Sequence, residues 1–308
     1  MSKYDITQIT GVIPALLTFF DEHENVDEKR TRDMIENLIG QDVGGFYLTG
    51  STGQAFTMTM EERMRVVEIV CDQVRGRKPV IVHVGNIGTK MSIELARQAE
   101  SAGADAISSV PPFYWKFSAE NIYHYYRDIS ESVDIPMVIY NIALAGLMDE
   151  KLILKLASLP NVKGLKFTDR AHDEMGHLKT MLGKNFMIYS GCDEMAYSGL
   201  RFGADGIIGS FYNVIPDLYK KIYTAERNNH DTEAVRLMKI ADEFVFAVLK
   251  YDFLGAIYNV IRWRGWDAGY PRRPFKTYRE EELIDLKKEL KEIREKYQAH
   301  ELDVFDLG

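Results

Sequence analysis

The sequence predicts an α/β protein, a (β/α)8 TIM barrel followed by a C-terminal helical appendage. Short apolar runs rich in Val, Ile, Phe and Tyr alternate with longer charged segments of helical period. Such alternation indicates parallel strands, and eight strand–helix units within about 220 residues fit a closed barrel. A doubly wound open sheet is the alternative, but no G-x-G-x-x-G follows the first apolar run and no Walker phosphate loop occurs.

Eight apolar runs are the expected strands, and each is followed by an expected helix. The strands cover Val12–Phe19, Gly44–Gly50, Pro79–Val84, Ala106–Pro112, Pro136–Asn141, Val162–Thr168, Phe186–Gly191 and Gly206–Ser210. The helices cover Asp27–Gln41, Thr59–Arg75, Lys90–Ala102, Ser118–Val133, Asp149–Leu159, Asp173–Leu182, Asp193–Phe202 and a segment that begins at Ile215. Asp27 is a candidate N-cap, and Thr59 with Glu62 forms a capping-box pattern.

The alternation stops after the eighth unit, so we expect two parts. Residues 1–228 would form the catalytic barrel, and residues 229–308 a C-terminal helical extension. Within the extension, helical period predicts helices over Thr232–Lys250, Asp252–Trp263 and Tyr278–Ala299.

Composition narrows the class of protein. The 308 residues are 46% hydrophobic and 27% charged, with a formal net charge of −8, which favours neither disorder nor nucleic-acid binding. Cys71 and Cys192 are too few for a disulfide framework or a cysteine-rich metal site. The N-terminus lacks the apolar core of a signal peptide, and no apolar run approaches the roughly 20 residues of a membrane span. We therefore expect a cytoplasmic protein.

The stretch Val162–Asp169, VKGLKFTD, carries a lysine in an awkward place. Strand alternation puts Val162, Gly164, Lys166 and Thr168 on one face, and Lys163, Leu165 and Phe167 on the other. An ammonium group is strongly solvated, and burial favours the neutral amine, the form that attacks carbonyl carbons. An ordinary lysine that reaches solvent at the strand end is the alternative.

In a β/α barrel the chemistry gathers where the strands end. The polar residues at these ends are Thr18, Ser51, Thr52, Asn86, Tyr114, Tyr140, Asn141, Lys166, Thr168, Asp193, Glu194 and Ser210. The turn Gly50–Gly53 offers two hydroxyls and backbone N–H groups suited to a carboxylate or phosphate oxygen. Tyr140 could move a proton or could be a core tyrosine, and Asp193 and Glu194 could bind ligand or merely cap a helix.

Two smaller clusters receive structural interpretations. His172 and His177 are five residues apart and belong to no HExxH or CxxC pattern, so we expect a chance pair of surface histidines and no metal site. We expect Arg272 and Arg273 to be solvated or at a subunit contact.

Four motifs then identify a family: GGFYLTGSTGQAF at Gly44–Phe56, IPMVIYN at Ile135–Asn141, GLKFTD at Gly164–Asp169 and GCDE at Gly191–Glu194. With GADGIIGSFYN at Gly203–Asn213, they resemble the pyruvate-dependent class I aldolases, the N-acetylneuraminate lyase and dihydrodipicolinate synthase superfamily. The resemblance implies that Lys166 forms a Schiff base, Tyr140 shuttles the proton with Ser51 as a relay, and Ser51 and Thr52 hold the carboxylate. It also implies that Tyr114 serves a neighbouring subunit's site.

The residues after Tyr140 indicate the branch of the superfamily. The synthase branch carries an arginine shortly after its YN motif, whereas here no basic residue occurs until Lys151. The sialic acid lyase branch is the more similar, which implies that Thr168, Gly191, Asp193, Glu194 and Ser210 bind the hydroxyl-rich part of the opened sugar. Carboxylates suit this task because each accepts several O–H bonds.

The resemblance implies reversible cleavage of N-acetylneuraminate to N-acetylmannosamine and pyruvate by a homotetramer, without metal or organic cofactor. Two alternatives stay open: an aldolase acting on another 2-keto-3-deoxy sugar acid, or a non-catalytic sugar-acid-binding protein. The chain departs from the family pattern at four positions, namely Phe19, Gln54, Ala143 and Ala145.

Overall fold

A computed structural model describes residues 3–308 and contains one barrel sheet. Its eight strands are β1 (Gly11–Pro14), β2 (Phe46–Leu48), β3 (Val80–His83), β4 (Ala106–Ser109), β5 (Met137–Ile142), β6 (Val162–Thr168), β7 (Met187–Ser190) and β8 (Gly206–Gly209). All paired strands are parallel, in the order β1-β8-β7-β6-β5-β4-β3-β2. The Leu16 amide donates to the Tyr47 carbonyl at 2.8 Å, which joins the β1 and β2 segments and closes the barrel. The TIM-barrel prediction is confirmed.

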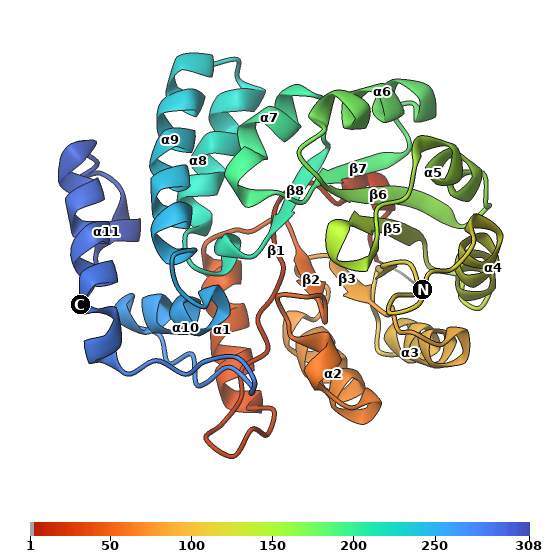
Figure 1. Ribbon diagram of the computed structural model, residues 1–308, viewed down its shortest axis with the longest axis horizontal. Helices are drawn as coiled ribbons and strands as arrows, with labels where there is room; N and C mark the ends of the chain where they lie inside the picture. The colour runs from red at the N-terminus through yellow and green to blue at the C-terminus, as the bar shows by residue number, and fades with distance from the viewer. Residues whose placement is uncertain (1–2) are drawn as a thin grey trace.

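Helices surround the strands (Figure 1). After the first seven strands come α1 (Glu28–Gly40), α2 (Met60–Val74), α3 (Thr89–Ser101), α4 (Ala119–Ser130), α5 (Glu150–Ala157), α6 (His172–Leu182) and α7 (Ala196–Arg201), and α8 (Pro216–Arg227) follows the last. Two of these helices begin at the capping signals expected from the sequence. Asp27 caps α1 by accepting from the Arg30 amide, and Thr59 and Glu62 form the capping box of α2.

Buried apolar side chains form two clusters. One fills the barrel interior and includes Ile13, Tyr47, Ile81, Val138, Tyr140, Met187, Tyr189 and Ile208. The other is larger and lies between the strands and the helices, where Leu165 and Phe167 pack. Val162 joins this outer cluster, contrary to the predicted face, because the β5–β6 register shifts between Met137 and Val138 and changes the phase of alternation.

The C-terminal segment consists of α9 (Asp231–Val248), α10 (Phe253–Trp263) and α11 (Ile284–Lys296), which gather beside α8 and α1 in Figure 1. Helix α9 packs against α8, α11 and the 3-10 turn η4 (Asp193–Met195). No single helix in residues 3–308 is long and apolar enough to span a membrane; α9 and α10 reach that composition only as a pair bent by 116°.

The first strand is shorter than predicted. Residues 15–19 are all buried, as their apolar character indicates, but the regular strand ends at Pro14. The Ala15 and Leu16 amides still bond to the carbonyls of Gly209 and Tyr47, and the chain leaves the sheet after Leu16. The Leu17 amide bonds to the side chain of Asn213 at 3.2 Å instead of to a neighbouring strand. The expected helix Asp193–Phe202 is similarly divided into η4 and α7.

Candidate active site

Lys166 lies inside the barrel, near the carboxyl end of β6. The register aligns it with Tyr140 of β5 on one side and Tyr189 of β7 on the other. The side chain is 4% exposed, and its Nζ lies 4.2 Å from the centroid of the Tyr140 ring and 4.4 Å from that of Tyr47. Two aromatic faces thus contact the amine, which compensates part of its desolvation by cation–π attraction.

Sequence reasoning missed Tyr47 and His83, which pack beside Tyr140. The three rings meet pairwise, with Tyr47 and His83 each 6.0 Å from Tyr140, centroid to centroid, and edge to face. The Tyr47 hydroxyl donates to Ser108 Oγ at 3.1 Å, and burial raises the pKa of this phenol well above its ordinary value. The sequence signal that could have identified them is that both occupy inward-facing positions, of β2 and β3, where a polar group is unusual.

His83 is held as a neutral ring. Its Nδ1 donates to the Thr49 carbonyl at 3.0 Å, while its Nε2 accepts from the Val110 amide at 3.2 Å, which determines the tautomer. Burial, and next the positive charge of Arg63, lower the pKa of His83 to about 3. Arg63 itself is buried and donates to the carbonyls of His83 and Gly85.

The hydroxyl-rich turn after β2 lies next to the end of β8. Thr52 Oγ1 and Ser210 Oγ are 2.6 Å apart, so these two predicted binding residues come together in one hydrogen bond. Thr18 Oγ1 donates to the Gly53 carbonyl at 2.7 Å and anchors the turn. Ser51 lines a largely apolar pocket of about 270 Å³ together with Phe56, Val110, Phe113, Ile142, Ala145 and others.

Gln54, one of the departures from the family pattern, joins this turn to the C-terminal segment. Its side-chain amide donates to the Tyr258 hydroxyl at 2.8 Å, and its Oε1 accepts from the Arg272 backbone N–H at 2.9 Å. The Tyr258 hydroxyl in turn donates to the Thr18 carbonyl at 2.6 Å. The amide satisfies one donor and one acceptor, which a carboxylate could not do.

Asp193 is the first residue of η4, and its side chain lies against the end of β8. Its Oδ2 accepts from the backbone N–H groups of Ser210 and Phe211, at 3.0 and 3.2 Å. Burial raises the pKa of Asp193 to about 6, with a further contribution from the negative charge of Glu194. A Cβ at Gly209 would overlap Asp193 Oδ1, so glycine is required for the carboxyl group to approach β8.

Thr168 and Gly191 complete the group around the lysine. A Cβ at Gly191 would overlap Thr168 Oγ1 and would lie 3.1 Å from Lys166 Cε, so the glycine leaves room for both side chains. Thr168 Oγ1 is buried and has no hydrogen-bond partner among residues 3–308, which leaves it available to a ligand.

Tyr114 stands apart from this group. Its side chain is 82% exposed, and its ring packs edge to face on Trp115, with 4.8 Å between centroids. Its φ of 79° is unusual for a residue with a side chain. The described chain therefore presents Tyr114 outward instead of to its own lysine.

Two structural interpretations of the sequence are wrong. His172 is not a surface residue: it is 3% exposed and its Nδ1 bonds to Ser198 Oγ at 2.9 Å. Arg272 is not solvated, because it is buried against Glu62, with 2.7 Å between the charged atoms, and lies over the Phe20 ring. Arg273 alone is exposed, paired with Glu24. Residues 3–308 hold no group of three or more His, Cys, Asp or Glu side chains that could bind a metal ion.

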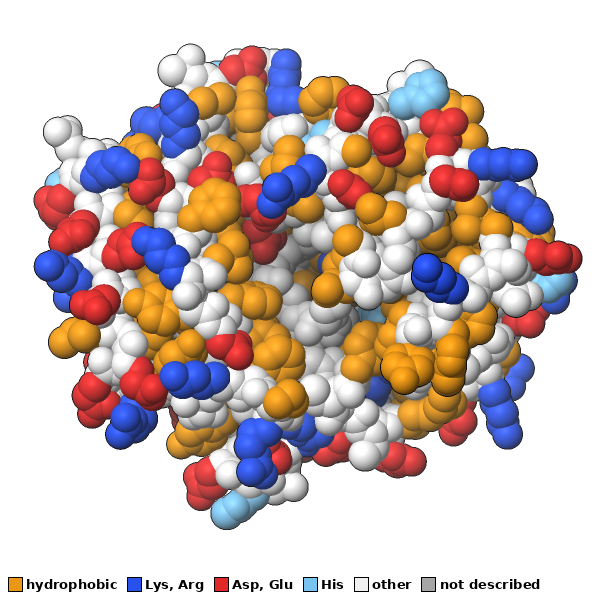
Figure 2. Space-filling view, in the orientation of Figure 1, with side chains coloured by type: hydrophobic (Ala, Val, Ile, Leu, Met, Phe, Trp, Pro, Cys, Tyr) orange, Lys and Arg blue, Asp and Glu red, His pale blue; other side chains and the backbone are white. Residues whose placement is uncertain are grey.

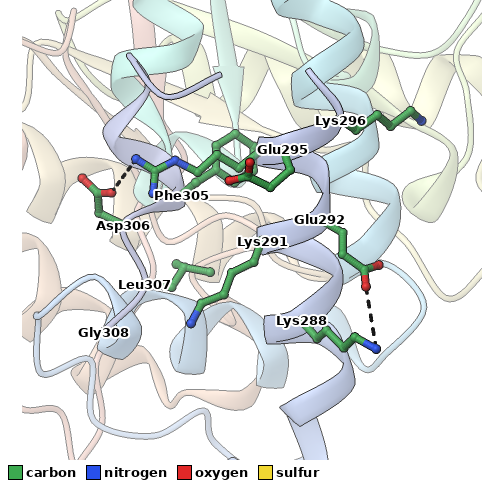
Figure 3. A pocket seen from close by; sticks show the side chains of 10 residues that line it. Lys288, Lys291, Glu292, Glu295, Lys296, Phe305, Asp306, Leu307 and Gly308 are labelled. Atoms are coloured by element: carbon green, nitrogen blue, oxygen red, sulfur yellow. Dashed lines mark ion pairs between the residues drawn. The ribbon is translucent and has the colours of Figure 1, made fainter. Parts of the chain in front are cut away.

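The centre of the strand ring coincides with a hollow in the space-filling view (Figure 2). A second depression, of about 880 Å³, lies between α11 and the C-terminal residues, as Figure 3 shows. Its lining is mainly charged and internally paired, with Lys288–Glu292 at 3.7 Å and Arg294–Asp306 at 3.0 Å. No strand end contributes to it, so the chemistry belongs to the barrel.

Comparison with known proteins agrees with this geometry. Residues 8–293 match the dihydrodipicolinate synthetase family. An N-acetylneuraminate lyase of Salmonella paratyphi B is 36% identical over 285 residues, covering 91% of this chain and 95% of that protein. The structure of CdNal from Clostridium difficile in complex with mannosamine is 33% identical, covers 96% of this chain and 100% of that chain, and superposes with a TM-score of 0.88. A catalytic lysine mutant of the sialic acid aldolase of Ruminococcus gnavus is 28% identical, with coverages of 97% and 99% and a TM-score of 0.91.

Proposed function

This chain belongs to the dihydrodipicolinate synthetase family, and from that premise we propose that it cleaves N-acetylneuraminate reversibly to N-acetylmannosamine and pyruvate. The observation that carries the proposal is the buried lysine at the carboxyl end of a barrel strand, with a tyrosine ring against its amine. Relatives named N-acetylneuraminate lyase and sialic acid aldolase support the choice of sugar acid.

The reaction begins with the amine of Lys166. In its neutral form, Nζ attacks C2 of the open-chain 2-keto acid, and loss of water leaves an iminium that can accept an electron pair. Lys166 is buried and the rings of Tyr47 and Tyr140 lie against its amine, so the amine meets the substrate away from bulk solvent. The chain's own lysine thus supplies the electron sink.

Cleavage then needs a base at the C4 hydroxyl. The Tyr140 oxygen, having given its proton to the hydroxyl group that leaves as water when the iminium forms, takes this proton with Ser51 as a relay, and the C3–C4 electron pair moves into the iminium to give an enamine. N-acetylmannosamine leaves as the aldehyde. Protonation of the enamine at C3 and hydrolysis of the imine release pyruvate and restore the lysine.

The remaining polar groups position the substrate. Ser51 and Thr52 would bind the carboxylate through their hydroxyls and the backbone N–H groups of the turn. Thr168, Gly191, Asp193, Glu194 and Ser210 would bind the hydroxyl-bearing part of the sugar. The unpaired Thr168 Oγ1 and the proximity of Thr52 to Ser210 support this assignment.

We also propose that the enzyme acts as a homotetramer in the cytoplasm. The outward Tyr114 is suited to completing the site of a neighbouring copy. The free cysteines Cys71 and Cys192 fit a reducing compartment.

A pyruvate-release assay tests the proposal. N-acetylneuraminate and a six-carbon 2-keto-3-deoxy acid are supplied in parallel, and pyruvate is measured by a coupled dehydrogenase. Release from N-acetylneuraminate with the higher kcat/KM is expected. Preference for the six-carbon acid would assign the enzyme to a different sugar acid within the family, and release from neither would refute the cleavage of both.

A further inference from the structure

Asp242 is a carboxyl residue of α9 for which the fold offers no partner. It lies between buried stretches of the helix that include Ala241, Phe244 and Val245. Its Oδ1 is shielded from solvent and has no hydrogen-bond partner among residues 3–308. Desolvating an unpaired carboxyl group costs free energy, so a residue kept in this state calls for a reason beyond packing.

The position of α9 places Asp242 at the margin of the candidate site. Helix α9 packs against η4, the turn that carries Asp193 and Glu194. The buried Tyr219 hydroxyl of α8 donates to the Asp193 carbonyl at 3.2 Å. Burial, and next the negative charges of Asp193, Asp242 and Glu194, raise the pKa of this phenol well above its ordinary value, which agrees with all three carboxyl groups lying near it. Figure 2 shows acidic side chains at one margin of the central hollow.

The electrostatic environment of Asp242 is consistent with this location. Burial, and next the negative charge of Glu194, raise its pKa to about 7. Lys239, three residues earlier on α9, is exposed and forms no ion pair with Asp242, while Lys296 of α11 pairs with Glu243 at 2.7 Å and Lys250 pairs with Glu289 at 2.5 Å. Among residues 3–308, Asp242 therefore lies near the carboxyl group of Glu194 and forms no ion pair with a lysine or arginine.

We propose that Asp242 is a further substrate-binding residue, which with Glu194 holds the hydroxyl-bearing end of a long, uncharged sugar-acid tail. This inference rests on the proposed function and deepens it. Two adjacent carboxyl groups can accept hydrogen bonds from several hydroxyls, and together they repel a tail that carries a phosphate or a second carboxylate. Asp242 lies 48 residues beyond Glu194 in the sequence, so the C-terminal helices contribute to specificity.

Substituting the carboxyl group tests the proposal. Asp242→Ala is expected to raise KM for N-acetylneuraminate about tenfold, the scale of one hydrogen bond to a charged group. The KM for a six-carbon 2-keto-3-deoxy acid, which lacks the distal carbons, should change little. Asp242→Asn, which keeps the size and an acceptor, should fall between the wild type and the alanine variant.

The matched control is Glu243→Gln, the next residue on the same helix, whose partner Lys296 lies on α11. It should leave both KM values unchanged. Equal KM values in Asp242→Ala and wild type would overturn the inference, and so would an equal rise for both substrates.

A binding measurement separates this inference from the proposed function. Calorimetric titration with N-acetylmannosamine requires no turnover, and Asp242→Ala should bind it about tenfold more weakly than wild type. If the wild type releases no pyruvate yet shows this difference, the proposed function fails and the role of Asp242 stands. If the wild type turns over and the two proteins bind N-acetylmannosamine equally, only the role of Asp242 fails.

Discussion

At Lys166 the chain places a cation where hydrophobic packing alone would place an aliphatic residue. The rings of Tyr47 and Tyr140 contact the amine, and Gly191 withdraws to leave room for it. The aromatic faces offset part of the cost of burying the amine, and the glycine provides the space for it. We infer that the site tolerates an interior amine because its surroundings are aromatic and small.

The two tyrosines next to Lys166 are expected to differ in function. Tyr140→Phe should lower kcat for N-acetylneuraminate by about 10²–10⁴-fold, the usual contribution of a general acid–base group, while pyruvate still forms its adduct with Lys166. Tyr47→Phe removes the hydrogen bond to Ser108, so it should mainly lower the free energy of unfolding, by about 1 kcal/mol. Steady-state kinetics and chemical unfolding of both variants measure this. Equal losses of kcat would contradict the assignment of the proton to Tyr140.

Single residues were predictable where they broke a pattern. Lys166 stands out because a lysine occupies the inward phase of an apolar strand. Tyr47 fits its strand as an ordinary core aromatic, and His172 has no local mark of burial, so neither could be assigned from neighbours in sequence. Their environments depend on β5, β6 and α7, which only the folded barrel brings together.

At the scale of elements, the C-terminal helices hold the loops of the site. Tyr258 of α10 links the segment after β1 to the turn after β2, through Thr18 and Gln54. Arg272, in the loop after α10, binds Gln54 through its backbone and Glu62 of α2 through its guanidinium. The segment after residue 228 is therefore part of the support of the active site.

Gln54→Glu is expected to lower the free energy of unfolding by about 1–3 kcal/mol at pH 8, because the buried amide donor to Tyr258 is replaced by a charge. The introduced carboxyl group would have a raised pKa in the folded state, so the loss should shrink as the pH falls towards 5. Urea unfolding at the two pH values measures both effects. Gln8→Glu is the control, since its side chain is exposed and only accepts, from the Asp5 amide. A loss in Gln54→Glu that equals the control would show that the network contributes nothing.

Elements were predictable from local signals, and their junctions were not. The limits of β6 match the apolar run, and the caps of α1 and α2 follow from Asp27, Thr59 and Glu62. Residues 15–19 were predicted as strand because apolar character reports burial without specifying hydrogen bonds. The Leu17 amide is satisfied by Asn213, almost 200 residues away, which no local pattern reveals.

At the scale of the whole molecule, His83 should couple stability to pH. Its folded pKa of about 3 lies below its unfolded value near 6.5, so its contribution is present above pH 6.5 and is lost as the pH falls towards 3. By pH 4.5 the free energy of unfolding has fallen by about 2–3 kcal/mol through this group. His83→Gln should be less stable than wild type at pH 7, and the difference in Tm should narrow by pH 4.5. The exposed His177→Gln is the control, and parallel Tm curves for wild type and His83→Gln would contradict the coupling.

The proposed assembly makes a separate prediction about Tyr114. Tyr114→Ala and Lys166→Ala should each have very low activity, because each lacks one part of every site. Co-assembled oligomers should recover part of the activity, since some sites then combine an intact lysine with an intact tyrosine from a neighbour. Activity of the mixture is compared with the sum of the separate variants. No gain in verified mixed oligomers would place Tyr114 outside the neighbouring site.

The most direct test of the central claim is borohydride trapping with pyruvate, read by intact mass and peptide mapping. We predict one reduced adduct on Lys166, present in Lys163→Ala, whose side chain on the same strand is exposed, and absent in Lys166→Ala. An adduct on a different lysine, or no adduct on the folded protein, would contradict the Schiff-base mechanism.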